Sequence, residues 1–227
     1  MTEQDILAEL RDKLVVSCQA PPGDPLEGPS YMAAMATAAL AGGAAGIRAE
    51  GIDDIEAIRA VTTAPLIGLW KVPTEETHIT PTIDRAVAVA RAGADIVAFD
   101  ATRRPRPDGS RTDQMVAAIH AENRLAMADI ANVDDAAAAL EAGSDMVSTT
   151  LSGYVPRGPS PAGPDLALVA DLASRFLAPV FAEGRISTPA EGSQALRAGA
   201  FSVVVGTAIT APGAITASFA SALVGGL

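Results

Sequence analysis

A fourfold internal repeat constrains this chain more than any other feature. Four segments each combine the end of a helix, a glycine, a small residue and a short apolar run; they span residues 39–48, 90–100, 140–150 and 196–206. Glycine just past a helix is the usual left-handed stop, and we expect this conformation at Gly43, Gly93, Gly143 and Gly199. The apolar run that follows each glycine is typical of a strand buried on both faces.

Four further apolar runs of strand length lie between these repeats. They span residues 13–19, 65–71, 125–130 and 179–184. Amphipathic helical stretches precede them, at Glu3–Asp12, Asp53–Val61, Thr112–Glu122 and Asp165–Leu177. Strict alternation of strands and helices predicts a parallel sheet with helices outside. Eight units spaced by roughly 25 residues predict a single (β/α)8 barrel domain over residues 1–227, and a doubly wound open sheet is the alternative.

Polar residues stand at nearly every predicted carboxyl end of a strand. The residues at these ends are Gln19, Arg48, Lys71, Asp100, Asp129, Thr149-Thr150, Glu183 and Gly206, and all but Gly206 are polar. Strand ends turn polar in general as they reach solvent. This general tendency does not explain five charged residues on one rim of a barrel, because each charge must be paired, hydrated or used on a ligand. The sequence therefore predicts a site at this rim, where barrels carry their chemistry.

Three loops after these strands add to the prediction. The loop 148–165 is long and rich in proline, and it is a candidate lid that carries Tyr154 and Arg157. The turns EGRIST and VGTAIT follow the seventh and eighth strands, where barrels often bind phosphate. The phosphate-binding candidates are Gly184, Arg185, Gly206 and Thr207. The alternative for Arg185 is a salt bridge on the rim. For Asp100, the alternative to a direct role in the chemistry is a structural one, as the partner of Arg103 or Arg104.

Composition excludes several other classes of function. The formal net charge of −11 disfavours a nucleic-acid binder, which needs a basic face. The lone Cys18 rules out a disulfide framework and a cysteine-built zinc site, and His78 and His120 are far apart in the sequence, so no metal site is expected. The longest weakly polar stretch, Met32–Ile47, is too interrupted to span a membrane, and the start resembles no secretory signal. We expect a cytoplasmic protein.

Lys71 is the candidate base. It ends an apolar run, so its amine can be desolvated and its pKa lowered toward neutrality. The alternative is an ordinary surface lysine at a strand end. Glu183 is the candidate carboxylate beside it, with a salt bridge to Arg185 or Lys71 as the alternative.

Six motifs carry a resemblance to a known family. The segments SCQAPPGDPL, AAGIRAEGIDDI, DATRRPRPDG, STTLSGY, FAEGRISTP and VVVGTAIT are similar, in order and spacing, to the N-acetylmannosamine-6-phosphate 2-epimerase family. The resemblance covers nearly the whole chain. It implies a phosphate-binding (β/α)8 barrel that interconverts N-acetylmannosamine 6-phosphate and N-acetylglucosamine 6-phosphate by inverting C2, with no metal or organic cofactor. Relatives also suggest a homodimer.

The resemblance assigns roles residue by residue. The family's lysine falls on Lys71, and the carboxylate that works beside it falls on Glu183. The substrate-binding candidates are Gln19, Arg48, Asp129, Thr150 and Tyr154.

The chain departs from the family pattern at three places. Val72-Pro73 stands where relatives carry an Arg-Asp pair, Ala211 stands where they often carry an arginine, and Arg103 replaces a commoner lysine. The departures leave the Lys71–Glu183 pair intact and bear on the substrate. Two alternative functions also stay open. One is a lyase or synthase in which Lys71 forms a Schiff base. The other is a barrel that binds sugar phosphates without catalysis.

Overall fold

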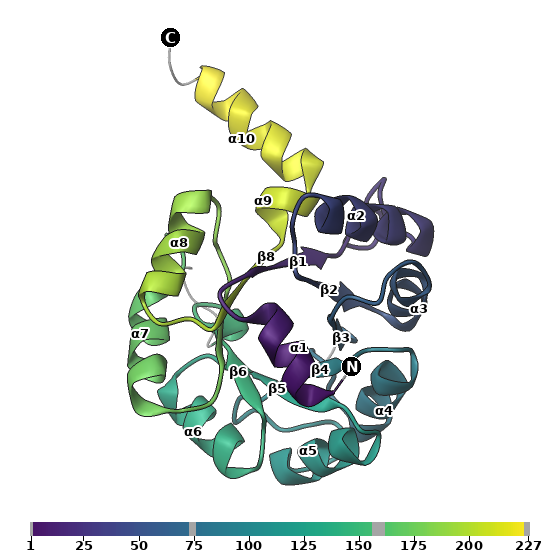
Figure 1. The fold of residues 1–227 in the computed structure, drawn as a ribbon, viewed down its shortest axis with the longest axis vertical. Helices are drawn as coiled ribbons and strands as arrows, with labels where there is room; N and C mark the ends of the chain where they lie inside the picture. The colour runs from purple at the N-terminus through teal and green to yellow at the C-terminus, as the bar shows by residue number, and fades with distance from the viewer. Residues whose placement is uncertain (1, 73–75, 156–161, 225–227) are drawn as a thin grey trace.

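Eight parallel strands close into one barrel in the computed structural model of this chain (Figure 1). The structure describes residues 2–72, 76–155 and 162–224. The strands are β1 (Leu14–Cys18), β2 (Gly46–Glu50), β3 (Leu66–Leu69), β4 (Ile96–Asp100), β5 (Leu125–Asp129), β6 (Met146–Ser148), β7 (Val180–Glu183) and β8 (Ser202–Val205). Each pairs in parallel with the next, and β1 pairs with β8. The closed order confirms the predicted barrel and rules out the open sheet.

Helices alternate with the strands around the outside of the barrel (Figure 1). They are α1 (Glu3–Leu10), α2 (Pro29–Ala41), α3 (Ile52–Val61), α4 (Ile83–Arg91), α5 (Thr112–Ala121), α6 (Val133–Glu141), α7 (Leu166–Arg175), α8 (Pro189–Arg197), α9 (Thr207–Thr210) and α10 (Pro212–Val224), with a 3-10 turn η1 (Thr149–Leu151) after β6. No helix among the described residues is long and apolar enough to cross a membrane.

The four repeated glycines end helices as the sequence predicts. Their φ angles are +102° at Gly43, +115° at Gly93, +98° at Gly143 and +102° at Gly199. A side chain at such an angle would bring Cβ against the following carbonyl, which is why glycine recurs at these helix ends.

Helix α1 lies across the amino-terminal opening of the barrel, in front in Figure 1. Its buried Ile6 and Leu10 pack with Ile67, Ile96 and Phe181, which point into the barrel. This packing closes the end of the barrel opposite the predicted site. A second apolar layer lies between the strands and the outer helices.

Two predicted strands end earlier than expected. The run 65–71 is a strand only as far as Leu69, because the backbone N–H of Trp70 donates to Thr80 Oγ1 instead of to a neighbouring strand. Lys71 then forms an isolated antiparallel bridge with Ile79. Similarly, β6 ends at Ser148, where the chain turns into η1. Both differences place polar residues just beyond the barrel wall.

Candidate active site

A buried guanidinium group connects the predicted site residues across the barrel. Arg48 comes from β2 and is 1% exposed. Its Nη2 lies 2.6 Å from Asp129 Oδ2 at the end of β5, and its Nη1 lies 3.3 Å from Glu183 Oε2 at the end of β7. A buried charge must be paired, and here one cation faces two carboxylates.

Two hydroxyl groups link these carboxylates to each other. Thr150 Oγ1 lies 2.8 Å from Asp129 Oδ1 and 3.1 Å from Glu183 Oε2. Ser148 Oγ lies 2.8 Å from Thr150 Oγ1 and 3.3 Å from Glu183 Oε2. A hydroxyl has one proton to donate, so the pattern of hydrogen bonds depends on which carboxylate is ionised.

Lys71 reaches the same site from the segment after β3. Its ammonium donates to Gln19 Oε1, and Gln19 Nε2 in turn donates to Ser17 Oγ at 2.8 Å. The backbone N–H of Lys71 donates to Glu50 Oε1 at 3.1 Å. The residue as a whole is exposed to solvent, while its amine is held by Gln19.

The environment shifts the protonation equilibria of both candidate proton carriers. Desolvation lowers the pKa of Lys71, and the positive charge of Arg48 lowers it further, against the raising effect of Glu50, Glu183 and Asp129. Burial raises the pKa of Glu183, against the lowering effect of Arg48. The two shifts bring the amine and the carboxyl group closer in proton affinity, which suits proton transfer.

Burial also raises the pKa of Asp129, and Arg48 and Thr150 oppose this rise. Arg48 itself stays charged, because the neighbouring Asp129 and Glu183 outweigh its desolvation and raise its pKa. The cluster therefore keeps a permanent positive charge beside two carboxyl groups.

Sequence reasoning missed three side chains that complete this site: Ser17, Glu50 and Ser148. Ser17 and Ser148 lie two residues before Gln19 and Thr150, and Glu50 lies two residues after Arg48. Arg48 and Glu50 both lie in β2, and alternate residues of a strand share one face, so this spacing was a signal that could have found Glu50.

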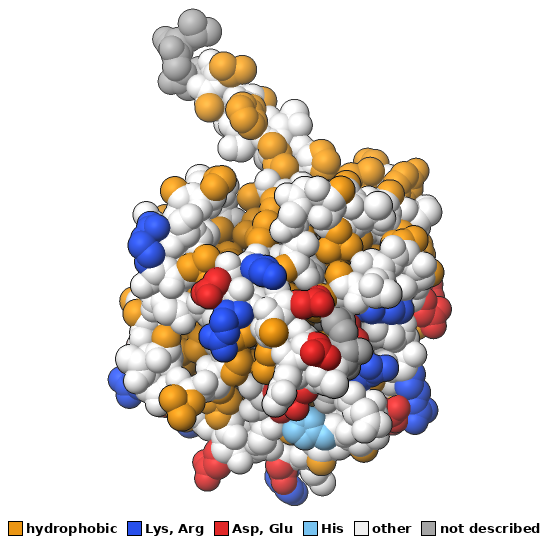
Figure 2. Space-filling view, viewed as in Figure 1, with side chains coloured by type: hydrophobic (Ala, Val, Ile, Leu, Met, Phe, Trp, Pro, Cys, Tyr) orange, Lys and Arg blue, Asp and Glu red, His pale blue; other side chains and the backbone are white. Residues whose placement is uncertain are grey.

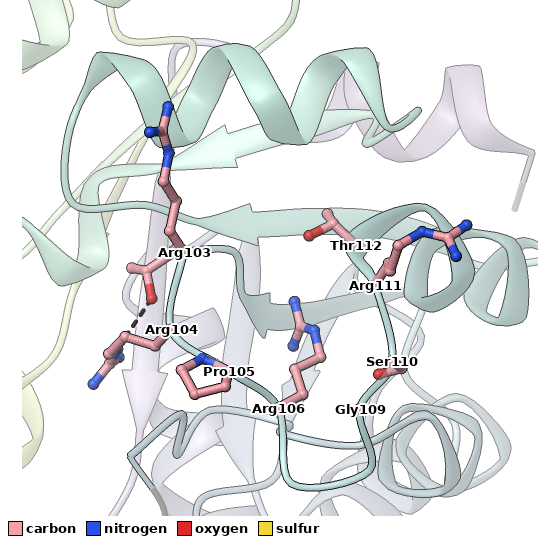
Figure 3. A pocket seen from close by; sticks show the side chains of 9 residues that line it. Arg103, Arg104, Pro105, Arg106, Gly109, Ser110, Arg111 and Thr112 are labelled. Carbon is pink, nitrogen blue, oxygen red and sulfur yellow. Dashed lines mark hydrogen bonds between the residues drawn. The ribbon is translucent and has the colours of Figure 1, made fainter.

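Asp100 lies outside this cluster and has a structural role, as one of the two alternatives predicted. Its carboxylate pairs with Arg104 and accepts from Thr102, and its carbonyl accepts from Arg106. Figure 3 shows Arg106 rising into the middle of the loop, while Arg103 and Arg111 point away from each other around a cavity of about 310 Å³. The arginine-rich motif thus stabilises the β4–α5 loop.

The phosphate-binding candidates follow neighbouring strands. Glu183 pairs in register with Val204, so the loops that contain Gly184 and Gly206 leave neighbouring strands at nearly the same level. Gly184 has a φ angle of +106°. A Cβ added to Gly206 would lie 3.4 Å from Ser17 Cβ, so the backbone passes close to β1 there. Thr207 is exposed at the start of α9.

Arg185 and Tyr154 form the rim beside Gly184. The Arg185 guanidinium lies 5.3 Å from the ring centroid of Tyr154, which is 46% exposed. Arg185 also donates to the carbonyl oxygens of Gly163 at 2.8 Å and Ser152 at 2.5 Å. It therefore ties the β7–α8 loop to the β6–α7 loop.

The remaining sequence predictions concern the candidate lid, the departures from the family pattern and metal binding. Arg157 of the candidate lid and Pro73 of the Val72-Pro73 departure lie outside the described residues. Val72 donates to the His78 carbonyl at 2.8 Å. Ala211 ends α9 directly before Pro212. Among the described residues there is no cluster of three or more potential metal ligands.

The fold and this cluster define a class: a (β/α)8 barrel that holds a lysine, an arginine and two carboxyl groups at the carboxyl end of its strands. A family model described as "Putative N-acetylmannosamine-6-phosphate epimerase" matches residues 32–224. The chain belongs to this family.

Individual relatives agree over nearly their full length. A protein of Cutibacterium acnes named "Putative N-acetylmannosamine-6-phosphate 2-epimerase" is 45% identical over 96% of both chains. One of the same name from Caldanaerobacter subterraneus is 46% identical over 96% of this chain and 93% of its own. The solved structure of the N-acetylmannosamine-6-phosphate 2-epimerase from Clostridium perfringens has a TM-score of 0.91 and 43% identity, covering 95% of each chain.

More distant structures share the fold alone. Thiamine phosphate pyrophosphorylase from Pyrococcus furiosus is 20% identical, with a TM-score of 0.62 over 93% of each chain.

Proposed function

We propose that this protein interconverts N-acetylmannosamine 6-phosphate and N-acetylglucosamine 6-phosphate by inverting C2. The family match supports the substrate class. The observation that carries the proposal is the position of the two proton carriers. Lys71 follows β3 and Glu183 ends β7, and these strands are four apart in a closed barrel of eight. They approach a central substrate from opposite walls.

Inversion at C2 takes one proton from one face of the carbon and returns one to the other. In the open-chain sugar, C1 is a carbonyl carbon next to C2. When a base removes the C2 proton, the C2–H electron pair forms a C1–C2 double bond and the carbonyl oxygen takes the negative charge. Protonation at C2 from the opposite face then restores the carbonyl group. The permanent charge of Arg48 is placed to stabilise the oxyanion.

The proposal requires Lys71 and Glu183 to hold one proton between them. A neutral Lys71 amine removes the C2 proton while a neutral Glu183 carboxyl group donates to the other face, and the reverse reaction uses the swapped protonation states. The lowered pKa of Lys71 and the raised pKa of Glu183 support this sharing.

The remaining candidates hold the substrate. Gln19, Asp129 and Thr150 offer hydrogen-bonding groups to the sugar, and Tyr154 borders the rim. Gly184, Arg185, Gly206 and Thr207 bind the phosphate after β7 and β8, where this fold commonly places it. The side chain of Arg185 already ties two loops, so the backbone carries much of this role.

We extend the proposal to the whole protein. The reaction needs no metal or organic cofactor, because the carbonyl oxygen on C1 accepts the charge. All eight strands belong to one closed barrel, so we infer that residues 1–227 form a single domain. We infer a cytoplasmic location, since sugar phosphates do not cross membranes unaided. We also infer that the protein forms a homodimer.

Paired substitutions test the roles of the two proton carriers. Lys71→Ala and Glu183→Gln are each expected to lower kcat for N-acetylmannosamine 6-phosphate by at least about 100-fold, the usual contribution of a positioned acid or base. The matched controls Lys13→Ala, at the opposite end of the barrel, and Glu56→Gln, on the outside of α3, should keep full activity. Loss of less than tenfold in both site variants contradicts the proposal.

Borohydride distinguishes the proposal from Schiff-base chemistry. We expect no covalent adduct when the protein is reduced with borohydride in the presence of substrate, because no imine forms. A trapped adduct on Lys71 would instead assign a lyase or synthase mechanism.

A further inference from the structure

Two arginines are buried among the described residues, and they differ in how their charges are neutralised. Arg48 is 1% exposed and lies against two carboxylates, whereas Arg106 is 8% exposed and forms no ion pair with a described residue. Nη2 of Arg106 donates to the carbonyl oxygen of Asp100 at 2.6 Å, and its Nη1 has no hydrogen-bond partner in the described part of the chain. A buried cation without a counter-ion is costly, so an anion is missing from this place.

The carboxylates closest to Arg106 are bound to other groups. That of Asp100 pairs with Arg104. That of Asp108 accepts from the backbone N–H and the hydroxyl group of Ser110, at 3.0 Å and 2.7 Å. Desolvation lowers the pKa of Arg106, and the charges of Asp100 and Asp108 oppose this shift without reversing it. Neither carboxylate therefore serves as the counter-ion of Arg106.

Arg106 points into the cavity of the β4–α5 loop, about 310 Å³ in volume, which three further arginines line (Figure 3). They are Arg103, Arg104 and Arg111. Arg103 is exposed and forms no ion pair with a described residue, and Arg111, which is 69% exposed, pairs with Asp113. Exposed side chains change rotamer within nanoseconds, so Arg103 and Arg111 are able to turn toward an ion in the cavity.

Helix α5 begins at the same cavity. Its first residue, Thr112, lines the wall, and Figure 3 shows the Thr112 hydroxyl group pointing into the cavity. The amino-terminal end of a helix carries a partial positive charge that favours an anion. The guanidinium carbon of Arg106 lies 5.4 Å from the ring centroid of Phe99, and this packing holds the plane of the guanidinium group. The cavity thus combines an oriented cation, a hydroxyl group and a helix terminus.

This concentration of arginines is local. The formal net charge of the chain is −11, and on the face around α1 basic and acidic side chains are interspersed (Figure 2). A cluster of one sign at a cavity raises the local concentration of the opposite ion. Arginine also matches the geometry of phosphate, to which it donates two parallel hydrogen bonds.

We propose that the cavity of the β4–α5 loop binds a doubly charged phosphate group, as inorganic phosphate or as a phosphate monoester. Arg106 donates from Nη1, and Arg103 and Arg111 close over the ion from the rim. This site follows β4, whereas the substrate phosphate site proposed above follows β7 and β8 on the other side of the closed barrel. The second site goes beyond the proposed epimerisation and does not depend on it.

Amide chemical shifts locate the bound phosphate directly. Inorganic phosphate is titrated into the isotope-labelled wild-type protein to about 20 mM, while sodium chloride is lowered to hold the ionic strength constant. Saturable shifts are expected at the amides of Gly109 and Thr112. Shifts confined to Gly184 and Gly206 would place the ion at the substrate site alone and overturn the proposal, as would the absence of saturable shifts.

Two pairs of substitutions separate a specific site from general attraction by positive charge. Arg103→Ser/Arg111→Ser should raise the phosphate Kd measured at Thr112 by at least about tenfold, because hydrogen bonds to a charged group are lost. The control Arg175→Ser/Arg197→Ser also removes one paired and one unpaired exposed arginine, from α7 and α8, and should leave this Kd unchanged. An unchanged Kd in Arg103→Ser/Arg111→Ser overturns the proposal.

A substitution at Arg106 and two other anions test the chemistry of the site. Arg106→Gln keeps a donor for the Asp100 carbonyl but removes the charge, and it should abolish the phosphate-dependent shift at Thr112. A folded Arg106→Gln protein that keeps the shift overturns the proposal. Acetate carries a single charge and should bind at least about tenfold more weakly than phosphate; equal binding overturns the assignment to phosphate. Glycerol 3-phosphate distinguishes the two sources, because a site for monoesters binds it as tightly as inorganic phosphate and a site for the free ion does not.

Discussion

Replacing Arg48 by methionine should strongly destabilise the fold, because it leaves two buried carboxyl groups without their cation. At an effective dielectric constant of about 20, the 2.6 Å contact with Asp129 corresponds to roughly 6 kcal/mol of attraction, and the 3.3 Å contact with Glu183 to roughly 5 kcal/mol. The substitution also removes the free-energy cost of burying the Arg48 charge, and this gain offsets much of the lost attraction. Broken buried pairs typically cost about 3–5 kcal/mol. For a chain of this size, that lowers Tm by about 6–20 °C.

The pH dependence of this loss is the specific part of the prediction. Without Arg48, the folded-state pKa values of Asp129 and Glu183 rise further above their unfolded values. The folded variant then binds more protons than the unfolded chain, so its stability increases as the pH falls. Urea unfolding should show the largest difference from wild type at pH 8 and a smaller one at pH 5.

A surface arginine provides the matched control. Arg91→Met breaks an ion pair with Glu122 whose arginine is 69% exposed, and it should change stability little at either pH. The reasoning about Arg48 is refuted if Arg48→Met unfolds like Arg91→Met, or if its deficit is the same at pH 8 and pH 5.

Three further predictions concern the proton carriers, the buried cysteine and a tightly packed glycine. The pH profile of kcat/KM should be bell-shaped, because acid protonates both Lys71 and Glu183 and alkali deprotonates both; a flat profile from pH 5 to 10 contradicts the shared proton. Burial raises the pKa of Cys18 to about 12, so iodoacetamide at pH 8 should label it in urea but not in the native protein, as mass spectrometry will show. Gly68→Ala should cost about 1–3 kcal/mol in urea unfolding, since its Cβ would lie 2.7 Å from Ala94 Cβ, whereas Gly213→Ala, with open space around it, should not.

The barrel could be predicted because the repeat consists of local signals. A glycine stop after each helix and an apolar run after each stop depend only on neighbouring residues, and the structure confirms the conformation at Gly43, Gly93, Gly143 and Gly199. The rim residues could be named for a similar reason: the carboxyl ends of parallel strands in a closed barrel must meet at one end.

Contacts between distant strands could not be predicted in the same way. The sequence placed Arg48, Asp129 and Glu183 on one rim, and the structure shows that Arg48 contacts both carboxylates. It also left open which arginine Asp100 would meet, and the structure pairs its carboxylate with Arg104 and its carbonyl with Arg106. Which side chains meet depends on how far each one reaches across the barrel. The reach is set by the register of the strands and by the position of each residue along its strand, and a local sequence pattern contains neither.

The end of the chain shows the same limit. The alternation of strands and helices predicts a helix after the eighth strand, and the short α9 is present there. Whether the apolar residues beyond it would cover β8 depends on the path of the chain at Ala211-Pro212, which no periodicity reveals.

Proton NMR of N-acetylmannosamine 6-phosphate with the protein in D2O, without added metal, tests the central claim most directly. The account predicts that N-acetylglucosamine 6-phosphate appears with deuterium at C2, because the group that protonates the second face exchanges with solvent. If no epimer forms and C2 keeps its proton, the proposed function is wrong. If the epimer forms but keeps the substrate's own C2 proton, one group serves both faces, and the opposed placement of Lys71 and Glu183 does not explain catalysis.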